Sequence, residues 1–145
     1  MKRLLLYLWN FWPPYWGAGI SIEHIEKDLR SVKVRLKNRP WTKNFVGTQF
    51  GGSIYSMTDP FYVVILITQL GRGYIVWDKS ASVRFRKPSK TDLIAEFKIL
   101  PSEIEDIKEC LKNQNKMDWE RDVLVKDVEG NLIAEVHKII HIRKK

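Results

Sequence analysis

The stretch GTQFGGSIYSMTDPFY, residues 47–62, decides how the rest of this chain is interpreted. Gly51 and Gly52 precede the longest apolar run of the sequence, which extends to about residue 70. Its length favours a buried helix over residues 52–70. Glycines at the start of a helix let a ligand approach the backbone, where unpaired N–H groups stabilise a developing oxyanion. The stretch therefore predicts a central helix with a candidate site at its beginning.

Asp59 and Pro60 interrupt this run and have two interpretations. Aspartate followed by proline is a good N-cap and first-turn pair, so that the helix would divide into residues 52–58 and 60–70. Alternatively, a proline kink would turn Asp59 into a cavity as a functional carboxylate. On a continuous helix Asp59 would lie on nearly the same face as Gly52 but about 10 Å further along the axis. A site built from both residues would therefore need two subunits with crossing helices.

The sequence around this helix is mostly strand-like. Alternation of apolar and polar residues predicts strands or hairpins near residues 20–36, 74–87, 93–99, 118–128 and 131–142. A tight hairpin turn is expected at Glu129-Gly130-Asn131. Ser102 and Glu105 predict a capping box at the start of a short amphipathic helix. This order predicts an antiparallel sheet wrapped around a central helix, an α+β architecture.

The first residues imitate a secretory signal without fulfilling its pattern. Two basic residues precede an apolar run, but Asn10 interrupts the run, and aromatic residues and prolines occupy the candidate cleavage region. The run is also shorter than the roughly 20 apolar residues that span a bilayer. We predict a helix over residues 2–12 that is ended by Pro13 and Pro14 and packs on the domain or on a partner subunit. An anchor on a membrane surface is the alternative, because Leu and Trp suit that interface.

Length and composition limit the remaining choices. The 145 residues, with 44% hydrophobic and 29% charged side chains, suit an N-terminal segment of residues 1–17 and one domain of residues 18–145. The net charge of +8 favours an anionic partner. Motifs for nucleic-acid binding are missing, so we expect phosphates of a small molecule rather than nucleic acid. The single cysteine, Cys110, suits a reducing cytoplasm, and the histidines lack metal spacing, so no metal is expected.

Three stretches resemble one protein superfamily. WPPYWGAGI at 12–20, NFVGTQFGGSIYSMTDPFY at 44–62 and VWDKSASVRFRKP at 76–88 resemble a bacterial family of the hot-dog thioesterase superfamily that is described as a domain of unknown function. The resemblance implies the hot-dog fold, in which a curved antiparallel sheet surrounds a long central helix. It covers the chain from near its start to Pro88, whereas the last two strands fit in pattern only.

The motif around the glycines is also similar to that of phenylacetic-acid-degradation type acyl-CoA thioesterases. The spacing of that motif is kept by Asn44, Gly47, Gly51, Gly52 and Asp59, whereas Phe50 stands where those relatives have histidine. The resemblance implies that a backbone N–H at the double glycine polarises the thioester carbonyl. It also implies that Asp59 of the facing subunit activates water or attacks directly, while Asn44 places substrate or water. Loss of the histidine removes a polar group from this pocket.

The resemblance also implies contacts to coenzyme A and to a second charged group. Substrate-binding residues would be Thr48, Phe50, Arg86 and Lys87, the two cations lying near the nucleotide end. The alternative for Arg86, as for Arg84, is a place on the charged outer face of its strand. The relatives carry a water-positioning serine where this chain has Asp78, which would face the helix only if the strand has a bulge. Strict alternation would instead point Lys79 at the helix.

In either register one charge faces the helix, and we hypothesise that it shares a site with Asp59. Lys79 would hold Asp59 ionised, whereas Asp78 would raise the proton affinity of the pair. The alternative is that both charges lie near a strand end and reach solvent.

Three functions are therefore considered. The first is an acyl-CoA thioesterase acting at a subunit interface of a homodimer or dimer of dimers, with Asp59 as base or nucleophile and no cofactor besides the coenzyme A of its substrate. The second is a non-catalytic protein that binds an acyl chain or acyl-CoA, favoured by Phe50 and by the apolar helix. The third is a basic surface module for membrane or nucleic acid, although no stable membrane insertion is expected.

Overall fold

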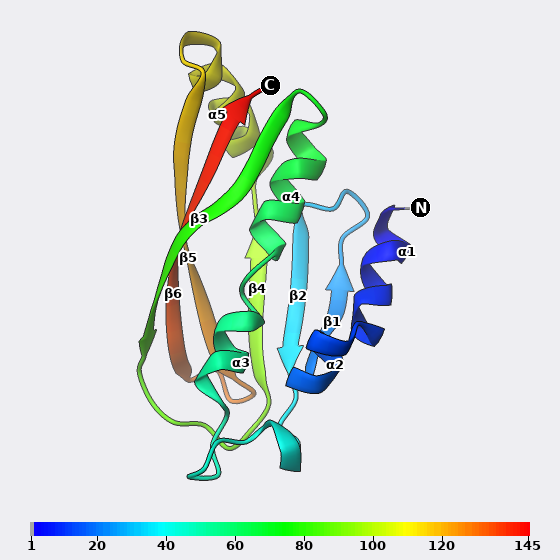
Figure 1. Ribbon diagram of the computed structural model, residues 1–145, viewed down its shortest axis with the longest axis vertical. Helices are drawn as coiled ribbons and strands as arrows, with labels where there is room; N and C mark the ends of the chain where they lie inside the picture. Colours follow the sequence, from blue (N-terminus) through cyan, green and yellow to red (C-terminus); the bar gives the residue numbers. More distant parts are fainter. Residues whose placement is uncertain (1) are drawn as a thin grey trace.

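A computed structural model describes residues 2–145 as an antiparallel sheet curved around a central helical segment (Figure 1). The strands are β1 (Ile20–Ile25), β2 (Ser31–Leu36), β3 (Tyr74–Phe85), β4 (Leu93–Lys98), β5 (Lys116–Asp127) and β6 (Leu132–Lys144). They lie in the order β1-β2-β4-β5-β6-β3, and every neighbouring pair is antiparallel. Asp127 to Asn131 form the turn between β5 and β6. The predicted α+β architecture is confirmed.

The central segment consists of two helices, α3 (Gly51–Ser56) and α4 (Phe61–Leu70). The break follows from Pro60, which has no N–H to continue the ladder. The prediction that Asp59 caps the second helix is wrong: Pro60 occupies the N-cap position. The backbone N–H of Asp59 donates to the carbonyl of Ser56 at 3.3 Å. The carboxylate of Asp59 is therefore not used in capping.

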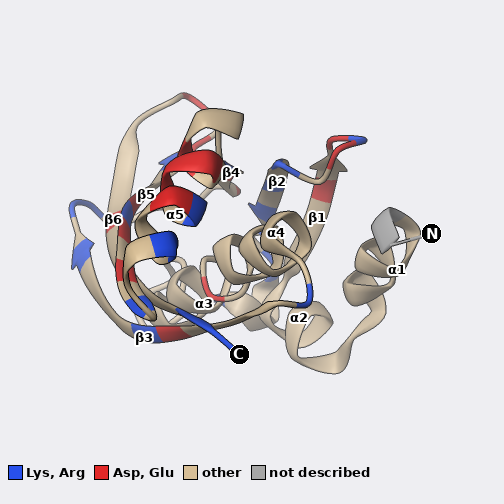
Figure 2. Cartoon of the chain, turned by 90° about the horizontal axis from the view of Figure 1, so that it is seen from above, with Lys and Arg blue, Asp and Glu red and all other residues tan. Residues whose placement is uncertain are grey.

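The hydrophobic core lies between α4 and the concave face of the sheet. Phe61, Ile65 and Leu66 of α4 are almost fully buried. The ring of Phe61 packs on Phe97 of β4, with centroids 5.0 Å apart. Burial of such side chains contributes roughly 1.5–3 kcal/mol each. In Figure 2 the helices α2, α3 and α4 show no charged residue, whereas acids and bases gather on α5, β3, β5 and β6.

The N-terminal segment forms α1 (Lys2–Tyr7), a 3-10 helix η1 (Leu8–Phe11) and α2 (Pro13–Ala18). The prediction that Pro13 and Pro14 only end a helix was incomplete, because they also occupy the first turn of α2, where missing N–H groups are tolerated. Asn10 exchanges two hydrogen bonds with the backbone of Ile22, at 2.6 and 3.2 Å. The hydroxyl of Tyr7 accepts a third from the backbone of Ile25. The segment thus packs along the outer edge of β1, where the hydrogen bonds of Asn10 and Tyr7 hold it.

The helix α5 (Pro101–Asn113) crosses the end of the sheet with Ile104, Ile107 and Leu111 buried. The predicted capping box of Ser102 and Glu105 is wrong in register. Pro101 already occupies the first helical position, and the carboxylate of Glu103 accepts a hydrogen bond from the backbone N–H of Leu100 at 2.8 Å. Between residues 2 and 145, no helix is both long and apolar enough to cross a bilayer.

Candidate functional site

Lys138 of β6 is completely buried, which is rare for a lysine. It lies on the inward face of its strand, between the buried residues Val136 and Ile140. Its Nζ donates hydrogen bonds to the carbonyl oxygen of Asp59 at 2.6 Å and to Oδ2 of Asp78 at 2.9 Å. Oδ1 of Asp59 lies 3.7 Å from the same Nζ. We call Lys138, Asp59 and Asp78 the Lys138 cluster; it ties the last strand to the break in the central helix.

A β-bulge in β3 decides which charge faces this cluster. The pairing of β3 with β6 shifts between Asp78 and Ser80, so that Asp78 points at the helix. Lys79 points to the outer face, where its Nζ lies 2.5 Å from Oδ2 of Asp118. The register with Lys79 turned inward is therefore wrong, and the register with the bulge is observed. The carboxylates of Asp59 and Asp78 both lie next to the Nζ of Lys138, which connects them.

The electrostatics of the Lys138 cluster depend on burial. Burial raises the pKa of the Asp78 carboxyl; the hydrogen bond and positive charge of Lys138 oppose this change, and the negative charge of Asp59 adds to it. Desolvation is the largest of these effects. The Asp59 side chain is 53% exposed, so solvent and ligands reach it. The cluster therefore combines one accessible carboxylate, one buried cation and a second carboxyl with increased proton affinity.

Asp59 also forms part of a second environment, a cavity of about 580 Å³ whose other walls are apolar or aromatic. We call it the aromatic cavity; it is lined by Leu8, Trp9, Phe11, Trp12, Pro13, Tyr15, Asp59 and Pro60. The rings of Trp9, Trp12 and Tyr15 pack on one another with centroids 5.4–6.3 Å apart. Asp59 is the only charged residue between Lys43 and Arg72 in the sequence. It places a single charge at the boundary between this cavity and Lys138.

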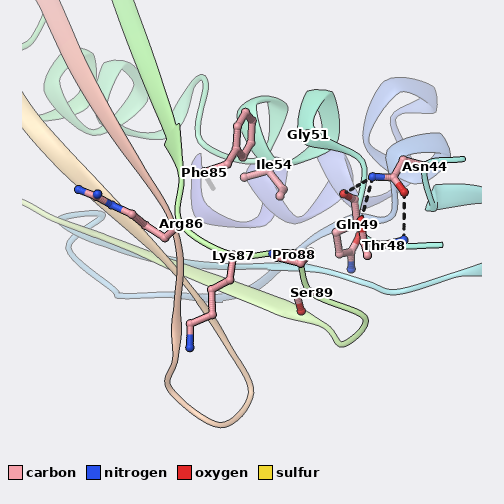
Figure 3. Close-up of a pocket in the computed structure, with 10 residues that line it drawn as sticks. All are labelled: Asn44, Thr48, Gln49, Gly51, Ile54, Phe85, Arg86, Lys87, Pro88 and Ser89. Carbon is pink, nitrogen blue, oxygen red and sulfur yellow. Dashed lines mark hydrogen bonds between the residues drawn. The ribbon is translucent and has the colours of Figure 1, made fainter. Parts of the chain in front are cut away.

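The predicted motif residues gather elsewhere, around a cavity of about 350 Å³ at the start of α3 (Figure 3). We call it the glycine cavity; it is lined by Asn44, Thr48, Gln49, Gly51, Ile54, Phe85, Arg86, Lys87, Pro88 and Ser89. Oδ1 of Asn44 accepts hydrogen bonds from the backbones of Val46 and Thr48, and its Nδ2 donates to Oγ1 of Thr48 at 2.8 Å. Asn44 therefore fixes the shape of the loop before α3.

The charges of the glycine cavity come from the end of β3. Arg86 and Lys87 both line it, but Arg86 also forms an ion pair with Glu135 of β6 at 2.5 Å. Half of the Arg86 side chain remains exposed. The pair reduces the positive charge that Arg86 presents to an anion, whereas Lys87 has no ion pair of 4 Å or less within residues 2–145.

Aromatic rings explain why both helix-starting residues are glycine. A Cβ on Gly51 would lie 3.0 Å from Cζ of Phe85, and a Cβ on Gly52 would clash with the ring of Phe50. Phe50 itself is 54% exposed. Phe50, at the position where the sequence resemblance implies histidine, therefore lies over Gly52 and covers part of the backbone there.

The structure thus divides the predicted site residues into separate groups. Asn44, Thr48, Gly51, Arg86 and Lys87 share the glycine cavity, with Phe50 and Gly52 beside it, and Asp59 and Asp78 belong to the Lys138 cluster. Among the described residues, the glycine cavity and the aromatic cavity share no lining residue. Lys79 lies on the outer face.

Sequence reasoning missed Lys138 and Tyr15. The alternation of inward residues in β6 carries the signal for Lys138, because a lysine follows Ala134 and Val136 at an inward position.

A family model that matches almost the whole sequence identifies the family. The model of DUF4442, described as a domain of unknown function, matches residues 2–142. The chain belongs to the DUF4442 family. The match includes the N-terminal helices that build the aromatic cavity, as well as Asp59, Asp78 and Lys138. No functionally curated protein matches the sequence significantly.

Solved structures establish the fold of this DUF4442 chain as the hot-dog fold. A protein of unknown function and probable thioesterase from Pseudomonas aeruginosa superimposes with a TM-score of 0.87 at 18% identity, over 100% of this chain and 97% of that one. A thioesterase from Haemophilus influenzae gives a TM-score of 0.69 at 13% identity, over 96% and 88%. The PaaI protein from the phenylacetic acid degradation operon of E. coli gives 0.65 at 13% identity, over 99% and 95%. The predicted resemblance is confirmed at the level of the fold.

Proposed function

We propose that this protein hydrolyses an acyl thioester, with Asp59 as the general base. The observation that carries the proposal is the position of Asp59, half-exposed at the wall of an apolar cavity and held from behind by the buried Lys138. Burying an ammonium group is unfavourable unless its charge and donors are all used. Lys138 donates to the backbone carbonyls of Thr58 and Asp59 and to the carboxylate of Asp78, which fixes Asp59 without covering its side chain.

The reaction requires two proton transfers and the exchange of a C–S bond for a C–O bond. Asp59 takes a proton from water while the water oxygen forms a bond to the thioester carbonyl carbon. The tetrahedral intermediate then breaks its C–S bond, and the leaving thiolate takes up the proton from Asp59. The products are a carboxylic acid and a free thiol, and Asp59 returns to its ionised form. Lys138 and Asp78 act as positioning residues, because neither needs to touch the substrate.

The glycine cavity supplies the second half of the proposed site. Arg86 and Lys87 would attract the phosphates of coenzyme A, and the polar loop around Asn44 and Thr48 would contact the thiol carrier. Backbone N–H groups at Gly51 and Gly52 would polarise the carbonyl, as the resemblance implies. Gly51 and Asp59 line separate cavities of one chain, which supports a homodimer or dimer of dimers in which each copy contributes one part. Coenzyme A would enter as part of the substrate.

The test is steady release of free thiol from a panel of acyl-CoA esters. The Asp59→Asn variant should lower kcat by a factor of roughly 10² to 10⁴ with the fold intact by circular dichroism, because the base is removed and the shape is kept. Asp106→Asn, on the exposed side of α5, is the matched control and should keep full turnover. Undiminished hydrolysis by the Asp59→Asn protein would exclude Asp59 as the base.

A second function is favoured by the ring of Phe50. Phe50 stands at the position where the resemblance implies histidine, and its ring lies over Gly52, where it restricts approach to the backbone donors. A protein with this arrangement would bind an acyl chain or acyl-CoA without hydrolysing it. Saturable binding of acyl-CoA by the wild type, without any thiol release, would establish this second function and exclude the first.

A further inference from the structure

The aromatic cavity is built mainly by the N-terminal helices rather than by the sheet. Its apolar walls come from η1 and α2, which lie beside β1 on one side of the central helix (Figures 1 and 2). Asn10 and Tyr7 hold this segment to the backbone of β1, and the stacked rings support one another. A cavity with walls fixed in this way is preformed, and its volume of about 580 Å³ is in the range of small-molecule sites.

Tyr15 lines this cavity and carries an unpaired polar group. The residue is 4% exposed, its hydroxyl oxygen is closed off from solvent, and this hydroxyl has no hydrogen-bond partner among the side chains of residues 4–145 or the backbone of residues 2–145. Buried hydroxyls are nearly always paired, so the unpaired one calls for a partner from outside the chain. Burial, and secondly the charge of Asp59, raise the pKa of Tyr15, which keeps the hydroxyl protonated as a donor. Tyr15 and Asp59 both line the aromatic cavity.

The distribution of polarity in the cavity describes its ligand. Asp59 is the only charged lining residue, and the other lining side chains are aliphatic or aromatic, with the Tyr15 hydroxyl and the indole N–H groups of Trp9 and Trp12 as their polar atoms. The rim carries Leu8, Phe11 and Trp12, each at least half-exposed, so the apolar lining continues to the surface. A complementary ligand has one oxygen-bearing end and a long apolar body. Saturated acyl chains have this form, and each buried methylene adds to affinity.

We propose that the aromatic cavity binds an aliphatic acyl chain within one copy of the protein, and that binding opens access to the buried hydroxyl of Tyr15, which then donates a hydrogen bond to the acyl oxygen beside Asp59. The identity of the ligand as a thioester rests on the proposed hydrolysis, whereas binding of the chain does not. The N-terminal segment is then the element that sets the preference for chain length. Phe11 and Trp12 at the rim would contact the distal end of a long chain.

The experiment measures binding to the Asp59→Asn protein by calorimetry, which keeps the ligand intact. The probes are free coenzyme A and its butanoyl, octanoyl and dodecanoyl esters. Affinity should increase with chain length, by at most about fourfold per methylene, until the cavity is filled. Equal affinities for coenzyme A and dodecanoyl-CoA would overturn the proposal.

Two pairs of variants test the named residues. Trp12→Ala removes one wall of the cavity and should weaken the increase of affinity with chain length. Trp16→Ala changes a residue of the N-terminal segment outside the cavity lining and should preserve that increase. Tyr15→Phe removes only the unpaired hydroxyl, so its melting temperature should be unchanged or higher while affinity for octanoyl-CoA falls roughly threefold to tenfold. Unchanged affinity in Tyr15→Phe, or equal losses in both tryptophan variants, would contradict the proposal.

The two proposals fail in different ways. Binding that depends on chain length in a wild type that releases no thiol would remove the hydrolysis and keep the acyl site. Thiol release whose KM ignores chain length and the Tyr15→Phe change would keep the hydrolysis and remove the acyl site.

Discussion

The glycine cavity and the Lys138 cluster differ in how far apart in sequence their residues lie. Asn44 and Thr48, which shape the glycine cavity, are four residues apart. Lys138 lies 79 residues from Asp59 and 60 from Asp78. The loop on one side of the glycine cavity therefore depends on local turns, although residues 85–89 complete the cavity, whereas the Lys138 cluster exists only in the completed fold. A motif in the sequence locates the first kind of region, whereas the second has to be seen in three dimensions.

The largest expected effect is a loss of stability on replacing the buried Lys138, compared with the exposed Lys79. Lys138→Met should lower the free energy of unfolding by about 3–5 kcal/mol, because it leaves Asp78 and the carbonyl of Asp59 without their donor. Lys79→Met is the matched control; it breaks a surface pair with Asp118 and should cost less than about 1 kcal/mol. Urea denaturation of the three proteins measures both values. Similar losses in the two variants would show that the Lys138 cluster contributes no more than a surface ion pair.

A smaller effect on stability is expected at Gly52, which lies under the ring of Phe50. Alanine favours a helix over glycine by about 1 kcal/mol, but a Cβ on Gly52 would clash with Phe50. Gly52→Ala should therefore give little or no gain in the wild type and a gain of up to about 1 kcal/mol in the Phe50→Ala background. A double-mutant cycle of unfolding free energies measures this coupling. Additive effects would mean that the ring does not hold its position over Gly52.

The smallest expected effect is the change of stability with pH that Asp78 causes. Burial raises the pKa of Asp78, so the folded state holds this proton more tightly than the unfolded state does. Stability contributed by Asp78 is therefore present at low pH and is lost as pH rises from about 4 through the raised value. Relative to Asp78→Asn, the wild type should become less stable between pH 4 and 7. Thermal melts of both proteins across this range measure the trend.

The outer face should show the opposite trend. Hydrogen bonds from Lys79 and His141 lower the pKa of Asp118, so its contribution is present above about pH 4 and is lost as pH falls. Relative to Asp118→Asn, the wild type should lose stability on acidification. If the stability difference between wild type and Asp78→Asn changed with pH in the same direction as that between wild type and Asp118→Asn, the assigned difference in burial would be contradicted.

The strands and the central helix could be predicted because their patterns are local. Inward residues such as Val34, Leu36, Ala95 and Phe97 alternate with polar ones, and each strand begins and ends close to its expected position. The helix boundaries near proline were less accurate. Proline excludes the interior of a helix but suits its first turn, so Pro13 and Pro101 mark beginnings as well as ends.

The candidate site was only partly predictable for a different physical reason. Asp59 is conspicuous as an isolated charge in an apolar run, and the bulge at Asp78 was one of two registers considered. Lys138 resembles a surface lysine in the sequence, and only the alternation of buried residues in β6 places it at an inward position. The partners of Asp59 in the aromatic cavity come from η1 and α2 and from packing across distant segments. Periodicity predicts the face on which a residue lies but not which element covers that face.

The place of β6 in the sheet also has a consequence for folding. This strand pairs with β5, which precedes it by a short turn, and with β3, whose residues lie about 60 positions earlier. Closing the long connection is entropically slower than closing the hairpin, so β3 joins β6 late. Lys138 can contact Asp59 and Asp78 only after that step. A nascent chain would therefore acquire its charged centre after the hairpin of β5 and β6 has formed, and molecules with only the hairpin would lack it.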